Sequence, residues 1–319
     1  MFESTESRGS NNEKRVGIVV DAGPAIGYGH AVRCLRLAKA LEPIAAVSFY
    51  AMSAPCHQFL SSNSTFDIRS ANLDSLPPLV ITDLREPHGI SARIHRQGSR
   101  HLSIHDLGLA QCQSDVAIDG SVMRLFPYLK DSGRELFVGP QYMITRMPVE
   151  RRELRDTVLI TLGGGVTAEF IDHIVDSISV LGLSVVTTRG FSSGSPLDET
   201  ELESAIATCR FAISSAGTSI YDLLASGVPT IAVAFDTLQL RTADAFQEMG
   251  AVLSAGLFHR LSPGALLGCC KEVLSNQPLI HRLSHAGRLL VDGKGLSRVA
   301  EIARRQLWLT NQTKTYMAC

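Results

Sequence analysis

Short runs of apolar and β-branched residues alternate with segments of helical periodicity along both halves of the chain. The first half opens with the apolar run RVGIVVD at 15–21, which ends in a glycine-rich turn and is followed by HAVRCLRLAKAL at 30–41. Apolar residues recur in the second of these segments near the helical period of about 3.6 residues. A buried strand followed by an amphipathic helix is typical of parallel α/β sheets.

The same rhythm continues to the end of the chain. In the first half we expect a helix at 91–97 and further strands at 45–51, 78–83, 101–106 and 114–119. The second half restarts with a strand in DTVLITLGGG at 156–165, a helix at 168–181 and a strand at 183–189. The stretch 211–235 has the pattern of strand, turn, helix, turn and strand, and successive helices are expected at 262–276, 277–293 and 295–309.

An irregular, charged stretch at 139–155 separates the two halves. We expect a disordered tail at 1–14, one α/β domain at 15–150, and a second at 151–319 that includes the terminal helices. A chain of 319 residues is long enough for two such domains. The carboxyl ends of two parallel sheets joined by one linker face a common cleft, and open α/β sheets bind ligands at that edge.

Composition excludes several classes of function. The net charge is −1 with no long basic run, which argues against a nucleic-acid partner. No apolar run approaches the ~20 residues of a membrane span, so no integral membrane segment is expected. The polar N-terminus lacks the apolar core of a signal peptide, and the seven cysteines form no C-x-x-C pair. These features predict a cytoplasmic protein with reduced thiols, and they leave its oligomeric state open.

Small residues follow the predicted strand in SSAGTSIYDLLASG. Ser215, Gly217 and Thr218 would present backbone N–H groups and hydroxyls at a helix N-terminus, where the helix dipole favours phosphate. Asp222 lies one helical turn after Thr218, so its carboxylate is placed to accept hydrogen bonds from both ribose hydroxyls. The alternative is a tight strand–helix turn in which Asp222 is a solvated helix residue.

A second glycine-rich turn, TLGGGVT, has neither G-x-G-x-x-G spacing nor the lysine of a Walker A loop. The backbone of Gly164 and Gly165 either approaches a bound phosphate or sugar, or simply turns the chain. His101 and His105 share a predicted strand, where about 13 Å would separate them, too far to share one ion. We therefore expect no metal site, and no cofactor.

The stretch AIGYGHAVRC places Gly27 and Gly29 just before His30, in the first turn of a predicted helix. The positive end of the helix dipole disfavours imidazolium, so we expect His30 to be neutral at pH 7 and able to accept a proton as a general base. Asp21, at the end of the preceding strand, is a candidate to fix the imidazole tautomer. The alternatives are a histidine that packs or caps the turn and an aspartate that caps the loop.

From Val16 onward the chain resembles the UDP-sugar hydrolases of the pseudaminic acid pathway and their spore-coat polysaccharide relatives. The family pattern runs from a strand ending in Asp through I-G-x-G-H to R-C, matched here by IGYGHAVRC after Asp21. The segments ITD, SIHDLGLAQCQSDVAID, VGPQYMITR, ITLGGG and ISSAGTSIYDLLASGVPTIAV match later family segments in order. The resemblance implies a GT-B fold, with two Rossmann-like domains whose parallel sheets face a central cleft.

The resemblance also implies an activity, namely metal-independent hydrolysis of a nucleotide-activated sugar such as a UDP-linked acetamido sugar. In this hypothesis His30 activates a water molecule, Asp21 or Asp83 orients the histidine or the sugar, and a nucleoside diphosphate leaves. The implied substrate-binding residues are Gly27, Gly29, Arg33, His88, Tyr142, Gly164, Gly165, Ser215, Gly217, Thr218, Asp222 and Gln239.

Several positions depart from the family pattern. Val19 replaces an arginine, His88 stands where the family has a cleft tyrosine, Asp222 replaces a glutamate, and only Gln239 remains of an Asn-Gln pair. The altered positions lie on the sugar side of the implied site, so the sugar is not predicted. Two alternatives stay open: a GT-B glycosyltransferase that passes the sugar to an acceptor hydroxyl, and a non-catalytic protein that binds a nucleotide sugar.

Overall fold

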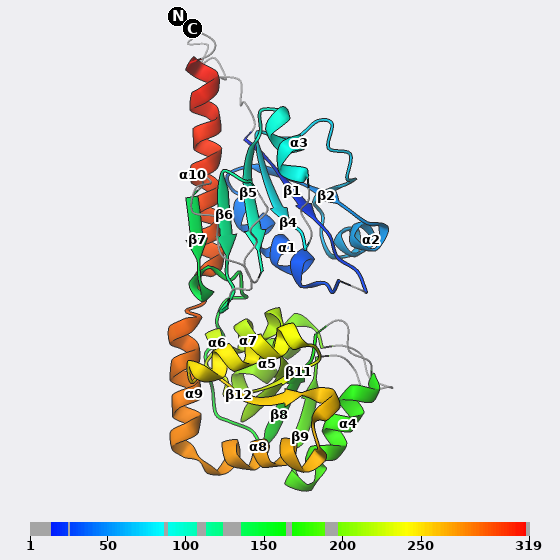
Figure 1. Ribbon diagram of the computed structural model, residues 1–319, viewed down its shortest axis with the longest axis vertical. Helices are drawn as coiled ribbons and strands as arrows, with labels where there is room; N and C mark the ends of the chain where they lie inside the picture. The colour runs from blue at the N-terminus through cyan, green and yellow to red at the C-terminus, as the bar shows by residue number, and fades with distance from the viewer. Residues whose placement is uncertain are drawn as a thin grey trace, which may run out of the picture.

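The chain folds into two α/β units stacked end to end, each built on a parallel sheet (Figure 1). A computed structural model describes residues 14–24, 26–85, 89–106, 113–123, 135–163, 168–188 and 197–316. The predicted fold class, α/β with two parallel sheets, is confirmed. In the part of the chain that is described, no helix has both the length and the apolar character needed to cross a membrane.

The first sheet has seven parallel strands in the order β3-β2-β1-β4-β5-β6-β7. The strands are β1 (Arg15–Val20), β2 (Ala46–Ala51), β3 (Asp67–Ser70), β4 (Leu79–Asp83), β5 (Arg100–His105), β6 (Val116–Asp119) and β7 (Glu135–Val138). The helices between them are α1 (Gly29–Leu41), α2 (Ala54–Asn63) and α3 (Ile90–Arg96). Every element predicted here is present within two residues, whereas α2, β3 and β7 were not predicted.

The second sheet has five parallel strands in the order β12-β11-β10-β8-β9. The strands are β8 (Thr157–Thr161), β9 (Ser184–Thr187), β10 (Phe211–Ser215), β11 (Thr230–Ala234) and β12 (Leu253–Leu257). The helices are α4 (Ala168–Ile178), α5 (Glu199–Thr208), α6 (Thr218–Ala225), α7 (Thr237–Glu248), α8 (Pro263–Ser275) and α9 (Gln277–Leu290). Short 3-10 turns are η1 (Pro140–Tyr142), η2 (Ser179–Leu181) and η3 (Phe258–Arg260).

The last helix, α10 (Gly295–Tyr316), returns to the first unit and lies along its sheet (Figure 1). Its apolar residues Val299, Ile302 and Leu307 belong to the same buried cluster as Leu37 of α1. The sequence interpretation grouped this helix with the second domain, but its packing joins it to the first. The chain therefore crosses between the units twice.

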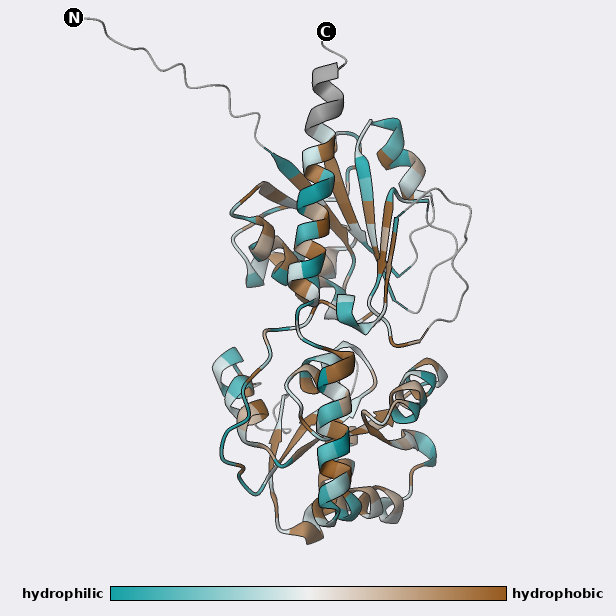
Figure 2. Cartoon of the chain, turned by 90° about the vertical axis from the view of Figure 1, so that its left-hand side faces the viewer, coloured by the Kyte–Doolittle hydropathy of each residue, from teal (hydrophilic) through white to brown (hydrophobic). Residues whose placement is uncertain are grey.

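Each core lies between a sheet and its covering helices. The central strands β4, β10 and β11 are buried along their whole length. Figure 2 shows strands of both units largely in the brown of hydrophobic residues, whereas the helices carry both polar and apolar residues. Continuous apolar runs of this kind are expected where both faces of a parallel sheet are covered. Polar side chains on such strands are therefore exceptions that need a partner.

His101 of β5 is one of these exceptions. Its Nε2 lies 2.9 Å from the Thr82 hydroxyl, and burial lowers its pKa to about 3, with smaller contributions from the neighbouring His95 and His105. In the unfolded chain a histidine takes up a proton below about pH 6.5, whereas buried His101 does not. We expect this difference to lower the free energy of unfolding by about 2 kcal/mol between about pH 7.5 and pH 5.

Urea unfolding at the two pH values measures this difference, and a His101→Asn variant is the control, because it removes the titrating ring. The variant should lose most of this pH dependence. An equal pH dependence in the two proteins would show that His101 does not cause it.

Candidate functional site

Two cavities occupy the cleft between the units among the described residues. The first, of about 590 Å³, is lined by loops that follow the carboxyl ends of β1, β4, β8, β10 and β11. This is the sheet edge at which open α/β folds bind ligands. Its lining includes the predicted residues Gly27, Gly29, His30, Ser215, Gly217, Thr218 and Gln239. Residues predicted separately in the two halves of the chain therefore meet at one cavity.

The N-terminal ends of two helices meet across this cleft. A Cβ atom added to Gly29, the first residue of α1, would lie 2.7 Å from the hydroxyl oxygen of Thr218, the first residue of α6. Neither helix has a side-chain cap, so the first-turn N–H groups are not used by a capping residue. Side-chain caps are present on α2, α5, α7, α8 and α9, whereas α3 also has none. Helices α1 and α6 both point the positive ends of their dipoles at the cleft.

The turn between β1 and α1 explains the glycine at position 27. Gly27 has a φ of +89°, which favours glycine, and its N–H donates to the carbonyl of Gly23 at 2.7 Å. This small loop delivers Gly29 and His30 to the cavity. Gly27 is therefore required for the conformation of the loop as well as lining the cavity.

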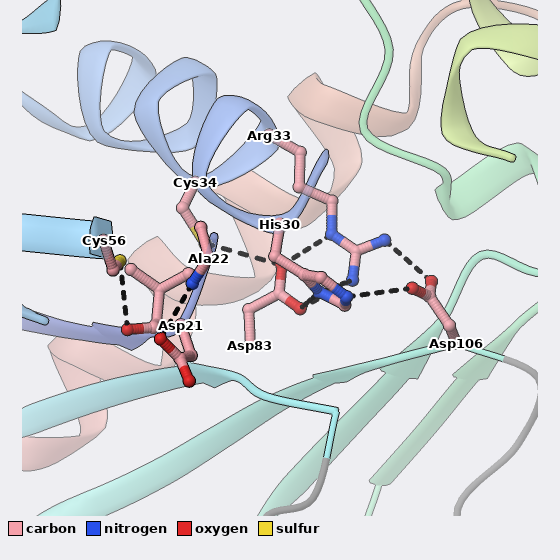
Figure 3. Close-up of polar contacts among 9 residues, drawn as sticks. Asp21, Ala22, His30, Arg33, Cys34, Cys56, Asp83 and Asp106 are labelled. Atoms are coloured by element: carbon pink, nitrogen blue, oxygen red, sulfur yellow. Dashed lines mark hydrogen bonds and ion pairs between the residues drawn. The ribbon is translucent and has the colours of Figure 1, made fainter. Parts of the chain in front are cut away.

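His30 lies beside a buried carboxylate (Figure 3). Its Nδ1 donates to Asp83 Oδ1 at 2.7 Å, and Asp83, at the end of β4, is fully buried. Arg33, one turn further along α1, donates to both oxygens of Asp83 at 2.5 and 2.6 Å and to Asp106 at 2.7 Å. The Arg33 and His30 charges hold the pKa of Asp83 well below its usual range despite burial.

Arg33 Nη2 also lies 3.1 Å from Nδ1, but the Asp83 contact is shorter, and ionised Asp83 can only accept. The bond to Asp83 therefore assigns the proton to Nδ1 of His30 and leaves Nε2 as the acceptor. Nε2 lies 3.8 Å from Asp106 Oδ2. Burial lowers the pKa of His30, but Asp83 and then Asp106 outweigh burial, so the pKa lies above its ordinary value of 6.5. The expectation that the helix dipole keeps this histidine neutral is wrong in direction, because the carboxylates dominate.

Asp21 does not contact His30 in this arrangement. Its Oδ1 accepts from the Ala22 N–H at 2.9 Å (Figure 3). The same oxygen accepts from the Ser53 hydroxyl at 2.5 Å. Asp21 therefore ties the end of β1 to the start of α2, which is the loop-capping alternative. Of the two aspartates proposed to orient His30, only Asp83 is in contact with it.

The second cavity, of about 520 Å³, adjoins the first, and Gly29, Gly163 and Thr218 line both. Asp222 lies in its wall. Asp222 Oδ1 accepts from the backbone N–H of Arg146 at 2.9 Å, and its two oxygens also accept from Arg36 at 3.3 and 3.2 Å. The carboxylate predicted to bind ribose is thus not solvated but paired with arginines of the first domain and the linker.

The other predicted residues fall into three groups. Tyr142 packs against Phe137 and lines neither cavity, so the structure does not bring it to the site. Arg33 borders the second cavity, although its guanidinium is used by Asp83 and Asp106. The residues outside the described part of the chain are His88, Gly164 and Gly165.

Sequence reasoning missed two residues of the site, Asp106 and Arg36. Asp106 directly follows β5, as Asp83 ends the neighbouring strand β4, so the same rule of polar residues at strand ends would have found it. Arg36 lies seven positions after Gly29 on α1, and therefore on the same helix face. Its partner is 186 positions away, which no local pattern indicates.

No family model matches the chain. It is 24% identical over 333 residues to the spore coat polysaccharide biosynthesis protein SpsG of Bacillus subtilis (strain 168), a match that covers 90% of this chain and 97% of SpsG. The identity is low, but the match extends over nearly the full length of both proteins.

Several solved glycosyltransferase structures share the architecture. The calicheamicin glycosyltransferase CalG4 matches with a TM-score of 0.64 at 12% identity, covering 93% of this chain and 98% of CalG4. MurG of Acinetobacter baumannii matches with a TM-score of 0.65 at 14% identity, covering 91% and 99%. The glycosyltransferase VinC, solved in complex with dTDP, matches with a TM-score of 0.62 at 15% identity, covering 93% and 100%. The predicted GT-B fold is therefore confirmed: this chain has the two-domain fold of these glycosyltransferases.

Proposed function

We propose that the protein is a glycosyltransferase-like enzyme that cleaves a nucleoside-diphosphate sugar and passes the sugar to an acceptor hydroxyl. The observation that carries the proposal is the meeting of two uncapped helix N-termini at a pair of adjoining cavities, with His30 lining the larger one. The fold shared with CalG4, MurG and VinC supports this reaction class, and the dTDP bound to VinC supports a nucleotide donor.

The diphosphate is assigned to the shared wall of the cavities. The backbone of Gly29, Thr218 and Ser219 belongs to the first turns of α1 and α6, where N–H groups and helix dipoles favour phosphate oxygens. Two such termini stabilise the negative charge that develops on the leaving diphosphate. The proposal therefore includes no metal ion.

The nucleoside is assigned to the second cavity and the sugar to the first. Asp222 supplies a carboxylate for the ribose, and Leu197, Leu202 and Ile206 give the same cavity an apolar wall for a base. In the first cavity, Asp236 and Gln239 provide polar groups for sugar hydroxyls, beside the aromatic ring of Phe235. A few polar groups on a largely apolar wall are typical of ligand sites.

His30 is assigned as the general base. Its Nδ1–H stays on Asp83 while Nε2 accepts the proton of the acceptor hydroxyl, whose oxygen forms a bond to the anomeric carbon. The bond from that carbon to the phosphate oxygen breaks, and the nucleoside diphosphate leaves with the electron pair. The imidazolium that forms is stabilised by Asp83 and by Asp106, 3.8 Å from Nε2.

Water is the second candidate acceptor. Two observations support water. The I-G-x-G-H segment resembles a segment of the UDP-sugar hydrolases, and His30 within it lines the first cavity. A hydroxyl acceptor is placed first because the matching structures are glycosyltransferases. The difference lies only in what occupies the space next to Nε2.

A donor panel tests the proposal. Purified protein is incubated with UDP-, dTDP- and GDP-sugars, with and without simple sugars and alcohols as acceptors, and CMP-sugars serve as donors that lack a diphosphate. We expect nucleoside diphosphate release that rises with an acceptor and is insensitive to EDTA. Replacing His30 with glutamine should lower turnover by about 10²–10⁴-fold while nucleotide binding persists.

The other outcomes separate the alternatives. Repeated turnover without any acceptor would establish hydrolysis in place of transfer. Nucleotide binding without turnover under every condition would leave a binding protein. Failure of all nucleoside diphosphates to bind would contradict the proposal as a whole.

Asp83 supports the base, so Asp83→Asn should lower the pKa of His30, measured by NMR titration of the ring. It should also lower the free energy of unfolding by about 3–5 kcal/mol, because Arg33 is left buried beside a neutral group. The pKa of the base governs the low-pH limb of kcat/KM, which should move to lower pH in the variant.

The matched control is Asp106→Asn, because Asp106 is 32% exposed and Asp83 is 0% exposed. This variant should change the pKa of His30 and the stability less than Asp83→Asn does. A larger pKa shift from Asp106→Asn would show that Asp83 is not the main support of the base.

A further inference from the structure

Arg36 joins the two domains at the second cavity. On α1, Gly29, Val32, Arg33 and Arg36 follow one helix face, and all four line this cavity. Arg33 is committed to Asp83, whereas Arg36 reaches across to Asp222 of α6. Both members of this pair are mostly buried, with 20% and 15% of their side chains exposed. The ion pair therefore stands in the space assigned to the nucleotide.

The contacts of Asp222 differ in length. The backbone N–H of Arg146 lies 2.9 Å from Oδ1, but the two Arg36 bonds are 3.3 and 3.2 Å long and the Arg146 Nε bond to Oδ2 is 3.4 Å long. Charge-assisted bonds between guanidinium and carboxylate are commonly about 2.7–2.9 Å long. A ligand hydroxyl that approaches Asp222 from the cavity therefore competes with the long guanidinium contacts more readily than with the backbone N–H of Arg146. Arg36 holds both oxygens of Asp222 by such contacts, whereas the Arg146 side chain holds only one.

We propose that the ribose hydroxyls of a bound nucleotide replace Arg36 on Asp222, and that the freed guanidinium pairs with the α-phosphate. This inference rests on the proposed function. Arg36 lines the same cavity as Thr218 and Ser219, where the diphosphate is assigned, and its long side chain has room to turn there. Arg36 is then a specificity residue that favours nucleotides over nucleosides, and the ligand replaces a direct ion pair between the domains.

The exchange makes the two ligand classes respond in opposite directions. A nucleoside breaks the Arg36–Asp222 pair and offers the arginine nothing in return. A nucleotide breaks the same pair and supplies a phosphate. Loss of Arg36 therefore helps the first ligand and harms the second.

Isothermal titration calorimetry with uridine and UDP tests this. Arg36→Ala should bind uridine about 2–5-fold more tightly, because the Arg36–Asp222 pair no longer has to be broken, while the contact of Arg146 Nε with Asp222 is the same in both proteins. The same variant should bind UDP about 10-fold or more weakly, because a charge-assisted bond to phosphate is lost. Arg36→Met, which keeps the apolar stem, should behave in the same way and serves if the alanine variant does not fold.

Two controls isolate the effect. Arg210→Ala removes an exposed arginine–aspartate pair of the second domain and should leave both affinities unchanged. Asp222→Ala should weaken both ligands, since the ribose contact is lost. Shifts of uridine and UDP in the same direction in Arg36→Ala, or no shift, would overturn the exchange while the proposed function stands.

If the donor panel selects a nucleotide other than a uridine nucleotide, the corresponding nucleoside and nucleoside diphosphate replace uridine and UDP in this titration. Failure of every such pair to bind the unaltered protein would instead overturn the proposed function, and the exchange with it.

Discussion

The buried carboxylate of Asp83 is the constraint on which the site depends. Removing a carboxylate from water costs several kcal/mol unless partners replace the lost hydration. Asp83 receives two bonds from Arg33 and one from His30, so the end of β4 is bound to the first two turns of α1. The same bonds orient the imidazole and bring Arg33 to Asp106 beyond β5. One desolvated charge thus sets the relative positions of three segments that are far apart in the sequence.

Two close approaches of the backbone hold the domains at the distance that the site requires. At the cleft, Gly29 leaves room for Thr218, and a Cβ there would meet the threonine hydroxyl at 2.7 Å. Where the chain passes between the two units, a Cβ on Gly295 would clash with the carbonyl oxygen of Met143, so the linker and the start of α10 pack directly on each other. Any change at these contacts would alter the separation of the two helix N-termini, and with it the geometry available to a diphosphate.

Local patterns in the sequence predicted most of the fold, because apolar runs and helical periodicity record which face of each element is buried. They missed β3, whose residues DIRS are largely exposed at the edge of the sheet and form no apolar run. They also grouped α10 with the second domain, whereas it packs on the first. The apolar face of a helix indicates that the helix packs on a core, but it does not indicate which core. The same limit applies to the site. Local patterns indicated the glycines and His30 that follow strand ends. They did not indicate the pairing of Asp222 with Arg36, because that contact depends on how the two domains meet.

His30 lines the cavity, but its pKa shifts in the direction opposite to the one expected from the helix dipole. A helix N-terminus acts as about half a positive charge and disfavours imidazolium. The full charge of Asp83, 2.7 Å away and shielded from water, acts in the opposite direction and is stronger. In the proposed reaction this inversion is useful, because the carboxylates that raise the pKa of His30 also stabilise the imidazolium formed when the acceptor proton arrives. The uncapped N-termini of α1 and α6 can then stabilise the leaving diphosphate. In this proposal carboxylates act on the general base and helix dipoles act on the leaving group, within one cleft.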